Sequence, residues 1–509
     1  MPAFVLTLVL THACNLACGY CYMGEHHRAS MTPDVAERAL ALAFRRGEPV
    51  TVSFFGGEPL LEWDLLVHCA RRARQLGAEH DIAVRLQMTT NGVLLTKEKL
   101  AQLCELGVHM TLSIDGIRAA HEAGRPRMGG GSSFDAVVQA AHRIVESGQA
   151  LQVAAVVTPE NVEHLANSVR FFANLGARRI YLNPAWEREF SEAHLAVWQR
   201  ELEQVAALWK EARGTGRDLA IMTFDRKVLA AANGGLSRLE QCSMGSRNVA
   251  VAPSGNLYPC ERLVADDRNP RFVIGTLDGG LDATTSIPRG PADPECAACP
   301  ERFRCSSTCA CANLAETNAA DLPGPTQCWY ERITAELADE ASRALVEEQN
   351  ESFLSWIYGD IMKRTAPTRA KAPRTIPTRG AVAAALLIAT TAHAKDTESE
   401  RTGRLKIIVP AEQSGEREAA RGLVDGKRKP LNREIKLTPG RHQVAVVYPN
   451  GRIITRMLEI KEGKNPDAVY PPPDPPPPTL IPPKKSVDHD ETPGGMPPSP
   501  RRDPGRNNQ

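Results

Sequence analysis

The sequence predicts an α/β fold: a partial (β/α)6 barrel of the TIM type, followed by a small cysteine-rich domain and a separate small all-β tail domain. Three observations lead to this prediction. Strand-like and helix-like runs alternate through residues 4–213, and all thirteen cysteines except Cys69 and Cys104 fall into two groups. Residues 403–463 alternate in period two between turn residues, as short strands do.

The β/α alternation consists of six units. Strands are predicted near residues 4–10, 51–55, 83–89, 108–114, 151–157 and 179–183, and helices near 33–46, 62–76, 97–106, 134–147, 162–175 and 192–213. Units of this kind form a parallel sheet with helices outside it. Ligand-binding loops then belong at the carboxyl ends of the strands.

Three cysteines, Cys14, Cys18 and Cys21, follow the first predicted strand. Three thiolates this close together can bind three irons of a four-iron cluster and leave the fourth iron open to another ligand, which makes such a site catalytic. A zinc knuckle is the alternative, but zinc requires four ligands in a tetrahedron. The nearby candidates for a fourth zinc ligand are His12, His26 and His27.

Polar groups also follow the next three predicted strands. Gly56, Gly57 and Glu58 follow the second strand, and adjacent glycines let a backbone approach a ligand while a carboxylate can receive an ammonium group. Asn91 and Asp115 follow the third and fourth strands. Each precedes a glycine, and because Asn-Gly and Asp-Gly are common turn formers, both residues fit either a ligand site or loop structure.

The C-x3-C-x2-C spacing, with aromatic Tyr20 before the last cysteine, resembles the motif of the radical S-adenosylmethionine (radical SAM) superfamily. The resemblance implies a [4Fe–4S] cluster whose open iron binds the amino and carboxylate groups of S-adenosylmethionine. Reduction would cleave this cofactor to a 5′-deoxyadenosyl radical that takes a hydrogen atom from the substrate. By the same resemblance, the cofactor contacts are Gly56, Gly57 and Glu58 for the amino group, Ser113 and Arg125 for the carboxylate, and Asn91 and Asp115 for the ribose or for loop structure.

The second cysteine group resembles, cysteine for cysteine, the seven-cysteine SPASM domain, which binds two auxiliary four-iron clusters in its family. The resemblance implies that Cys296, Cys299, Cys305 and Cys328 ligate auxiliary cluster II, and that Cys242, Cys260 and Cys309 give three ligands to auxiliary cluster I. Sulfatase-maturating enzymes have a further cysteine shortly after the first, where this chain has Gly-Ser-Arg-Asn at residues 245–248. The fourth ligand of cluster I is therefore Cys311, or the iron is open to substrate. A structural zinc ribbon is the alternative for this spacing.

The cysteines indicate the cellular compartment in which the protein works, and the net charge bears on the class of its partners. Cluster ligands must remain thiolates, so residues 1–362 are expected to work in a reducing cytoplasm. A formal net charge of +1 gives no reason to expect nucleic acid as a partner.

Most SPASM proteins modify peptides or proteins, so the resemblance implies ribosomal peptide maturation with an external electron donor such as flavodoxin or ferredoxin. Sulfatase maturases that form formylglycine place an aspartate, their presumed base, directly after the second SPASM cysteine, where this chain has Glu261. The longer glutamate would displace the carboxylate by more than about an ångström, which can cost orders of magnitude in rate. Peptide maturation therefore ranks above sulfatase activation. A small-molecule radical enzyme and a non-catalytic iron–sulfur or zinc protein are the other hypotheses.

The sequence divides into six segments. Residues 1–235 are expected to form the barrel, and residues 236–362 the SPASM domain with a C-terminal helix from Tyr330 to Met362. Residues 363–380 read as a basic, Pro-rich linker. The last segments are residues 381–394, 395–465 and 466–509.

Residues 381–394 resemble a signal peptide, with a basic region before a short apolar core and a small-x-small site. The apolar run is shorter than the roughly twenty residues of a membrane span, so membrane contact or export of the tail and a buried Ala-rich helix are both open. Residues 395–465 are weakly similar to β-sandwich PEGA domains, and residues 466–509 are Pro-rich and expected to be extended or disordered. The tail is expected to be separable, either as a natural fusion or as two adjacent genes read as one chain.

Overall fold

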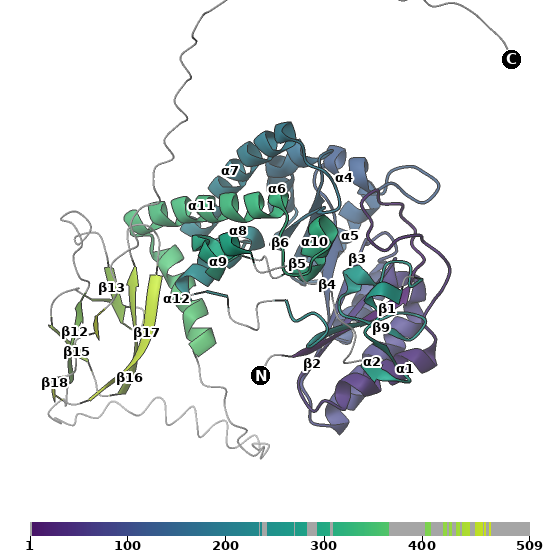
Figure 1. Cartoon of the computed structure of the whole chain (residues 1–509), viewed down its shortest axis with the longest axis horizontal. Coiled ribbons are helices and arrows are strands. Elements are labelled where there is room, and N and C mark those ends of the chain that lie inside the picture. The colour runs from purple at the N-terminus through teal and green to yellow at the C-terminus, as the bar shows by residue number, and fades with distance from the viewer. Residues whose placement is uncertain are drawn as a thin grey trace, which may run out of the picture. The chain divides into compact units, whose positions relative to one another are not determined.

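The computed structural model describes residues 3–233, 235–236, 242–268, 270–281, 293–305 and 309–365, and strand segments between residues 403 and 469. A mixed α/β fold contains a large sheet whose strands lie in the order β11-β10-β9-β8-β1-β2-β3-β4-β5-β6-β7 (Figure 1). The linker beyond residue 365, the predicted apolar segment 381–394 and most of the Pro-rich tail lie outside the described residues. None of the described helices is long and apolar enough to span a membrane.

The predicted β/α strands all form, and they are parallel neighbours in chain order. Leu86 of β3 pairs with Val52 of β2 and with Val108 of β4, so the buried positions of the three strands are in register. Because the strands are parallel, their carboxyl ends share one edge of the sheet. The strands are β1 (Phe4–Thr11), β2 (Val50–Gly56), β3 (Val84–Thr90), β4 (Val108–Ser113), β5 (Leu151–Val157), β6 (Ala177–Pro184) and the short β7 (Ala220–Ile221).

The predicted helices of the six units also form. Ala36, Ala39, Leu40 and Ala43 recur at helical spacing and give α1 its buried face, while Thr32 caps the helix by accepting from the N–H of Val35. Among the helices and strands of residues 3–232, the sequence analysis did not predict α4, α8 and β7. The helices are α1 (Pro33–Phe44), α2 (Trp63–Glu79), α3 (Lys97–Glu105), α4 (Arg118–Gly124), α5 (Phe134–Glu146), α6 (Leu165–Asn174), α7 (Glu192–Thr215) and α8 (Met222–Ala232).

The cysteine-rich region continues the same sheet. β8 (Asn248–Val251) pairs in parallel with β1, and β9 (Asn256–Tyr258), β10 (Gly275–Thr276) and β11 (Gly280–Leu281) follow as antiparallel strands. Cys260 therefore follows a strand that is two places from β1 in the sheet. The remaining short elements are the 3₁₀ turns η1 (Pro59–Glu62), η2 (Val162–His164), η3 (Glu261–Leu263), η4 (Pro270–Phe272) and η5 (Pro300–Phe303), and the helices α9 (Pro294–Ala298) and α10 (Ala310–Thr317).

The single helix predicted from Tyr330 to Met362 is wrong, because two helices form, α11 (Pro325–Glu347) and α12 (Glu351–Thr365). Gln349 adopts a left-handed φ of 57°, which ends the first helix. Asn350 then begins the second helix, since its Oδ1 accepts from the N–H of Phe353 and its Nδ2 donates to the carbonyl of Gly214. α11 packs against α7 and α8 (Figure 1).

The C-terminal region forms short strands, as its period-two pattern predicted. β13 (Arg421–Val424) and β14 (Lys427–Lys429) flank the predicted Asp425-Gly426 turn and pair antiparallel. One sheet has the order β14-β13-β16-β17, and the other has the order β15-β12-β18, with β19 pairing to β12. The remaining strands are β12 (Gly403–Ile408), β15 (Glu434–Leu437), β16 (Gly440–Val447), β17 (Ile453–Ile460), β18 (Gly463–Lys464) and β19 (Ala468–Val469).

Candidate functional site

The loop after β1 carries Cys14, Cys18 and Cys21, and its backbone is hydrogen-bonded to the end of α4 and the residues just after it. The N–H of Ala17 donates to the carbonyl of Pro126 at 2.9 Å, and that of Gly19 donates to the carbonyl of Gly124 at 3.1 Å. The three cysteines thus lie in a loop whose backbone is fixed by a second segment more than a hundred residues away.

These three cysteines are half-buried and form no disulfide. Burial raises the pKa of Cys14 to about 12. Burial is also the largest single influence on Cys21, but the hydrogen bonds from His26 and the backbone of Met23, together with the charges of His26 and Arg125, outweigh it and lower the pKa of that thiol. Among the described residues, no three His, Cys, Asp or Glu side chains converge as ligands of one metal ion. The thiolates of a four-iron cluster bind separate irons, so they need not converge in this way.

The Gly56-Gly57-Glu58 segment lies directly against the cysteine loop. The N–H of Gly57 donates to the carbonyl of Thr11 at 2.8 Å, and that of Glu58 donates to the carbonyl of Ala13 at 2.9 Å. A Cβ on Gly57 would lie 2.2 Å from the carbonyl oxygen of Ala13, so only glycine permits this approach.

Glu58 is buried beneath the loop, and burial raises the pKa of its carboxyl. Oε1 accepts from the N–H of Leu60 at 3.0 Å and from the hydroxyl of Thr90 at 2.8 Å, while Oε2 accepts from the N–H of Asn91 at 2.8 Å. A carboxylate has about four acceptor positions, so about one remains on Oε2 for a ligand.

Asn91 connects the end of β3 to the cysteine loop. Its Nδ2 donates to Oδ1 of Asn15 at 2.7 Å and lies 3.9 Å from Sγ of Cys14, and its Oδ1 accepts from the N–H of Val93. Both ends of the Asn91 amide therefore form hydrogen bonds within the protein, which favours a role in loop structure over a contact with the ribose.

Two polar side chains at the end of β4, Ser113 and Asp115, differ in how many hydrogen bonds they form within the protein. Within the described chain, the half-buried Ser113 hydroxyl forms no hydrogen bond. Asp115 is buried and binds the hydroxyl of Tyr20, the N–H of Val156 and Nε of Arg125. This also favours loop structure over a ribose contact for Asp115, whereas Ser113 has a free hydroxyl.

Four cysteines of the second group come from three segments: Cys242 precedes β8, Cys260 follows β9, and the other two lie at the start of α10. Cys309 precedes α10 and Cys311 lies in its first turn, with 3.6 Å between their sulfur atoms. Cys311 and Cys260 are both 6% exposed, and each affects the pKa of the other. Cys242 interacts with the backbone of Ala310 and with the charge on Cys309.

The other four predicted ligands are carried by α9, η5 and α11. Cys296 lies in α9, Cys299 follows it, and Cys328 lies in the first turn of α11. The charges of these three act on one another. Cys305 follows η5, in a loop whose residues 306–308 are not described.

Comparison with known proteins identifies the family: residues 8–172 match the family model of the radical SAM superfamily. These residues therefore form a radical SAM domain. The protein is an enzyme of this class, whose members use a [4Fe–4S] cluster and S-adenosylmethionine.

Several curated relatives are maturases. A serine-type anaerobic sulfatase-maturating enzyme of Klebsiella aerogenes is 25% identical over 324 residues, covering 61% of this chain and 80% of its own. The mycofactocin maturase MftC of Mycolicibacterium smegmatis is 28% identical, covering 63% and 81%. The PqqA peptide cyclase of Gluconobacter oxydans is 29% identical, covering 63% and 89%.

A solved structure, native anSMEcpe with bound AdoMet, has the same fold. Its TM-score is 0.57 at 19% sequence identity, covering 67% of this chain and all of that one.

Two arrangements in this radical SAM enzyme were not predicted. Arg262, two residues after Cys260, pairs with Glu187 and stacks at 4.5 Å over the ring of Tyr22, the neighbour of Cys21. Burial opposes its charge, but Glu187 and Tyr22 raise the pKa of Arg262. Glu261 is half-buried, with Oε2 3.6 Å from Sγ of Cys260. The sequence signal for the contact between Arg262 and Tyr22 was limited to the position of Arg262, two residues after the predicted ligand Cys260.

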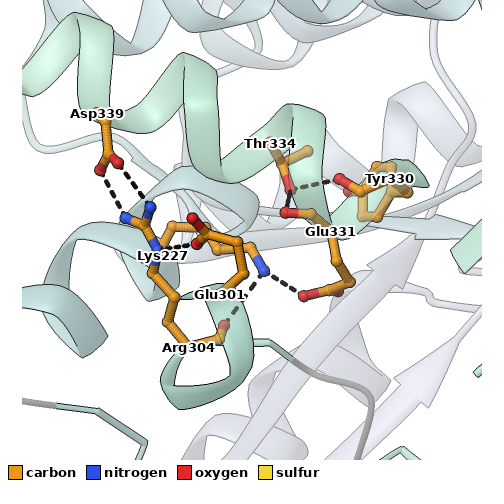
Figure 2. A network of polar contacts seen from close by, with 7 residues as sticks. All are labelled: Lys227, Glu301, Arg304, Tyr330, Glu331, Thr334 and Asp339. Carbon is orange, nitrogen blue, oxygen red and sulfur yellow. Dashed lines mark hydrogen bonds and ion pairs between the residues drawn. The ribbon is translucent and has the colours of Figure 1, made fainter. Parts of the chain in front are cut away.

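The second arrangement is a buried ion-pair network between α8, η5 and α11 (Figure 2). Nζ of Lys227 contacts the carboxylate of Glu331 and lies 3.2 Å from the carbonyl of Arg304. The guanidinium of Arg304 forms two bonds to Asp339, at 2.5 and 2.6 Å, and pairs with Glu301. Arg304 directly precedes Cys305. No local pattern indicated this network, because Lys227 and Glu331 are 104 residues apart.

Proposed function

We propose that this radical SAM enzyme modifies a peptide or protein substrate, in the manner of a peptide maturase. The observation that carries the proposal is the contact between the two cysteine groups. Tyr22, beside Cys21, stacks on Arg262, close to Cys260. Cys21 and Tyr22 also pack on an apolar cluster that contains Tyr258 and Val264. The names of the relatives, a peptide cyclase and two maturases, support the same reaction class.

The residues at the sheet edge fit the family's cofactors. Cys14, Cys18 and Cys21 would hold the cluster, because all three are free and share one fixed loop. Glu58 would receive the amino group of S-adenosylmethionine at its remaining acceptor position, beside the backbone of Gly56 and Gly57. Ser113 and Arg125 would hold the carboxylate. When bound, the cluster and S-adenosylmethionine supply the one-electron chemistry that removes a hydrogen atom from the substrate.

The second cysteine group is proposed to form a SPASM domain, residues 236–362, behind a partial (β/α)6 barrel of residues 1–235. Cys242, Cys260, Cys309 and Cys311 would hold auxiliary cluster I. The contacts of Cys311 with Cys260 and Cys309 support it as the fourth ligand, in preference to an iron left open. Cys296, Cys299, Cys305 and Cys328 would hold auxiliary cluster II. The reducing electron is proposed to come from a flavodoxin or ferredoxin.

Sulfatase maturation is the second candidate, since a sulfatase-maturating enzyme is among the relatives. The sequence replaces that class's aspartate base with Glu261. Because Glu261 extends toward Sγ of Cys260, peptide maturation remains the favoured function.

The experiment that tests the function is anaerobic co-expression of the full chain with the small peptides encoded beside its gene, followed by mass spectrometry of the peptides. We expect a fixed mass change in one peptide, together with formation of 5′-deoxyadenosine. Cofactor cleavage with no change in any peptide, but with conversion of a small molecule, would favour a small-molecule enzyme. Absence of cofactor cleavage by reconstituted protein would contradict both functions.

Gly57→Ala is expected to lower both iron content and S-adenosylmethionine binding. The new methyl group would meet the backbone oxygens of Ala13 and His12, at 2.2 and 2.8 Å, and would push the cysteine loop away. Overpacking of this kind costs about 1–3 kcal/mol. Iron analysis and equilibrium binding measure the effect. Gly19→Ala is the matched control, because nothing lies within 4 Å of its Cβ position. Equal losses in both variants would show that contact with the backbone is not the cause.

A further inference from the structure

The carboxylate of Asp115 joins three segments of the site. Its side chain is fully buried, and Oδ1 accepts from the N–H of Val156 in β5 at 2.9 Å. Nε of Arg125, after α4, lies 3.0 Å from the same oxygen, and Oδ2 accepts from the hydroxyl of Tyr20 in the cysteine loop. A buried carboxylate is tolerated only when it is paired and hydrogen-bonded, and all of these partners contribute to that.

The positive charge of Arg125 lies next to the loop that carries the three cysteines. Arg125 is 7% exposed, its Nη1 lies 4.0 Å from Sγ of Cys18, and its guanidinium lies 5.4 Å from the centre of the Tyr20 ring. The guanidinium is planar and its donors are fixed relative to one another. The ion pair at Nε therefore keeps the whole guanidinium, including Nη1, close to Cys18.

We propose that Asp115 is a positioning residue that holds Arg125 against Cys18, and that this buried charge pair sets the reduction potential of the cluster on the loop. The proposal rests on the proposed function in one respect, namely that Cys14, Cys18 and Cys21 bind the cluster. Hydrogen bonds to cysteine sulfur and charges around a cluster are established determinants of its potential.

The two charges act in opposite directions. A reduced cluster carries one more negative charge than an oxidised one, so the cation of Arg125 raises the potential and the anion of Asp115 lowers it. Both charges lie near Cys18, since Nη1 of Arg125 is 4.0 Å from its Sγ and Asp115 is paired with that arginine. Burial makes the effects larger, because charges in a protein interior are screened less than charges at the surface.

A purely structural pair would behave differently. Loss of either partner would then loosen the same contact and disturb the cluster in the same direction. A charge pair that sets the potential predicts shifts of opposite sign. The sign of the shift therefore separates the two roles.

The test is a redox titration of the reconstituted full chain, followed by electron paramagnetic resonance. It is run without S-adenosylmethionine, because Arg125 is also proposed to bind that cofactor. Arg125→Gln is expected to lower the midpoint potential. Asp115→Asn keeps an oxygen for Val156 and Arg125 while removing the charge, so it is expected to raise the potential. Asp135→Asn is the matched control, since that carboxylate is 70% exposed and pairs with Arg118 at the surface; no shift is expected.

Shifts of the same sign, or no shift in either variant, would overturn the proposal. If Asp115→Asn does not retain its iron, Arg125→Lys decides the question. Lysine keeps the charge, so its shift should be smaller than that of Arg125→Gln, and equal shifts would contradict the proposal. An unmodified protein that shows no four-iron signal would instead refute the proposed function, so the two failures are distinguishable.

Discussion

Cys18→Ala should reduce the yield of 5′-deoxyadenosine from S-adenosylmethionine to the background of a protein-free mixture. Of the three thiolates on the loop after β1, Cys18 is the one that lies beside Arg125. A cluster with only two cysteine ligands would lose its fixed position on the loop. Anaerobic reconstitution with excess reductant, followed by chromatography of the nucleoside products, measures the effect.

Two cysteine variants make this result specific. Cys104→Ala is the matched control, because Cys104 is a half-buried thiol on α3 with no proposed ligand role, and it should cleave the cofactor normally. Cys299→Ala removes a ligand of the second group and should leave uncoupled cleavage while losing the modified peptide. Equal nucleoside yields from Cys18→Ala and the unmodified protein would refute the proposed cluster site.

The parallel sheet and the motifs after its strands could be predicted because both depend on local sequence patterns. Alternating apolar runs predicted β1 to β6, and the C-x3-C-x2-C spacing lies within one loop. The polar residues after β2, β3 and β4 fall at one edge of the sheet because the strands are parallel. Their proximity to the cysteine loop therefore followed from the topology alone.

What could not be predicted depends on contacts between distant residues. Asp115 fits a turn before a glycine, and nothing nearby in the sequence indicates that it binds Tyr20 and Arg125 at once. Asn91 likewise donates to Asn15, 76 residues away. The break between α11 and α12 was missed because Gln349 has no strong local preference for a left-handed φ, whereas Asn350 has a partner in Gly214 that only the fold supplies.

Lys227→Met should destabilise the protein by about 3–5 kcal/mol, the range measured when one partner of a buried ion pair is removed. Lys227 is 5% exposed and Glu331 is 3% exposed, so solvent cannot replace the lost ammonium (Figure 2). The carbonyl of Arg304 loses its donor at the same time. The expected result is a lower midpoint of urea unfolding for the full chain, relative to the unmodified protein.

Lys210→Met is the matched control for this prediction. Its partner Glu348 is 53% exposed and lies 2.7 Å away, and surface pairs of this kind contribute about 0–1 kcal/mol. The double variant Lys227→Met with Glu331→Leu should recover much of the loss, because replacing both members of a buried pair with apolar residues is often neutral. A Lys227→Met variant no less stable than Lys210→Met would show that the buried pair adds nothing.

The same variant tests how the network relates to the second cysteine group. Arg304 is held by Asp339 and Glu301 as well as by its carbonyl contact with Lys227, and it is joined directly to Cys305. Loss of Lys227 should therefore loosen the loop after η5 that carries Cys305. Cys328, another proposed ligand of the same cluster, should keep its position in α11. Iron content should fall by no more than the share of one cluster, and cleavage of S-adenosylmethionine should persist, because the contacts of Lys227 and Arg304 lie among α8, η5 and α11. Loss of cofactor cleavage in soluble Lys227→Met protein would contradict that separation.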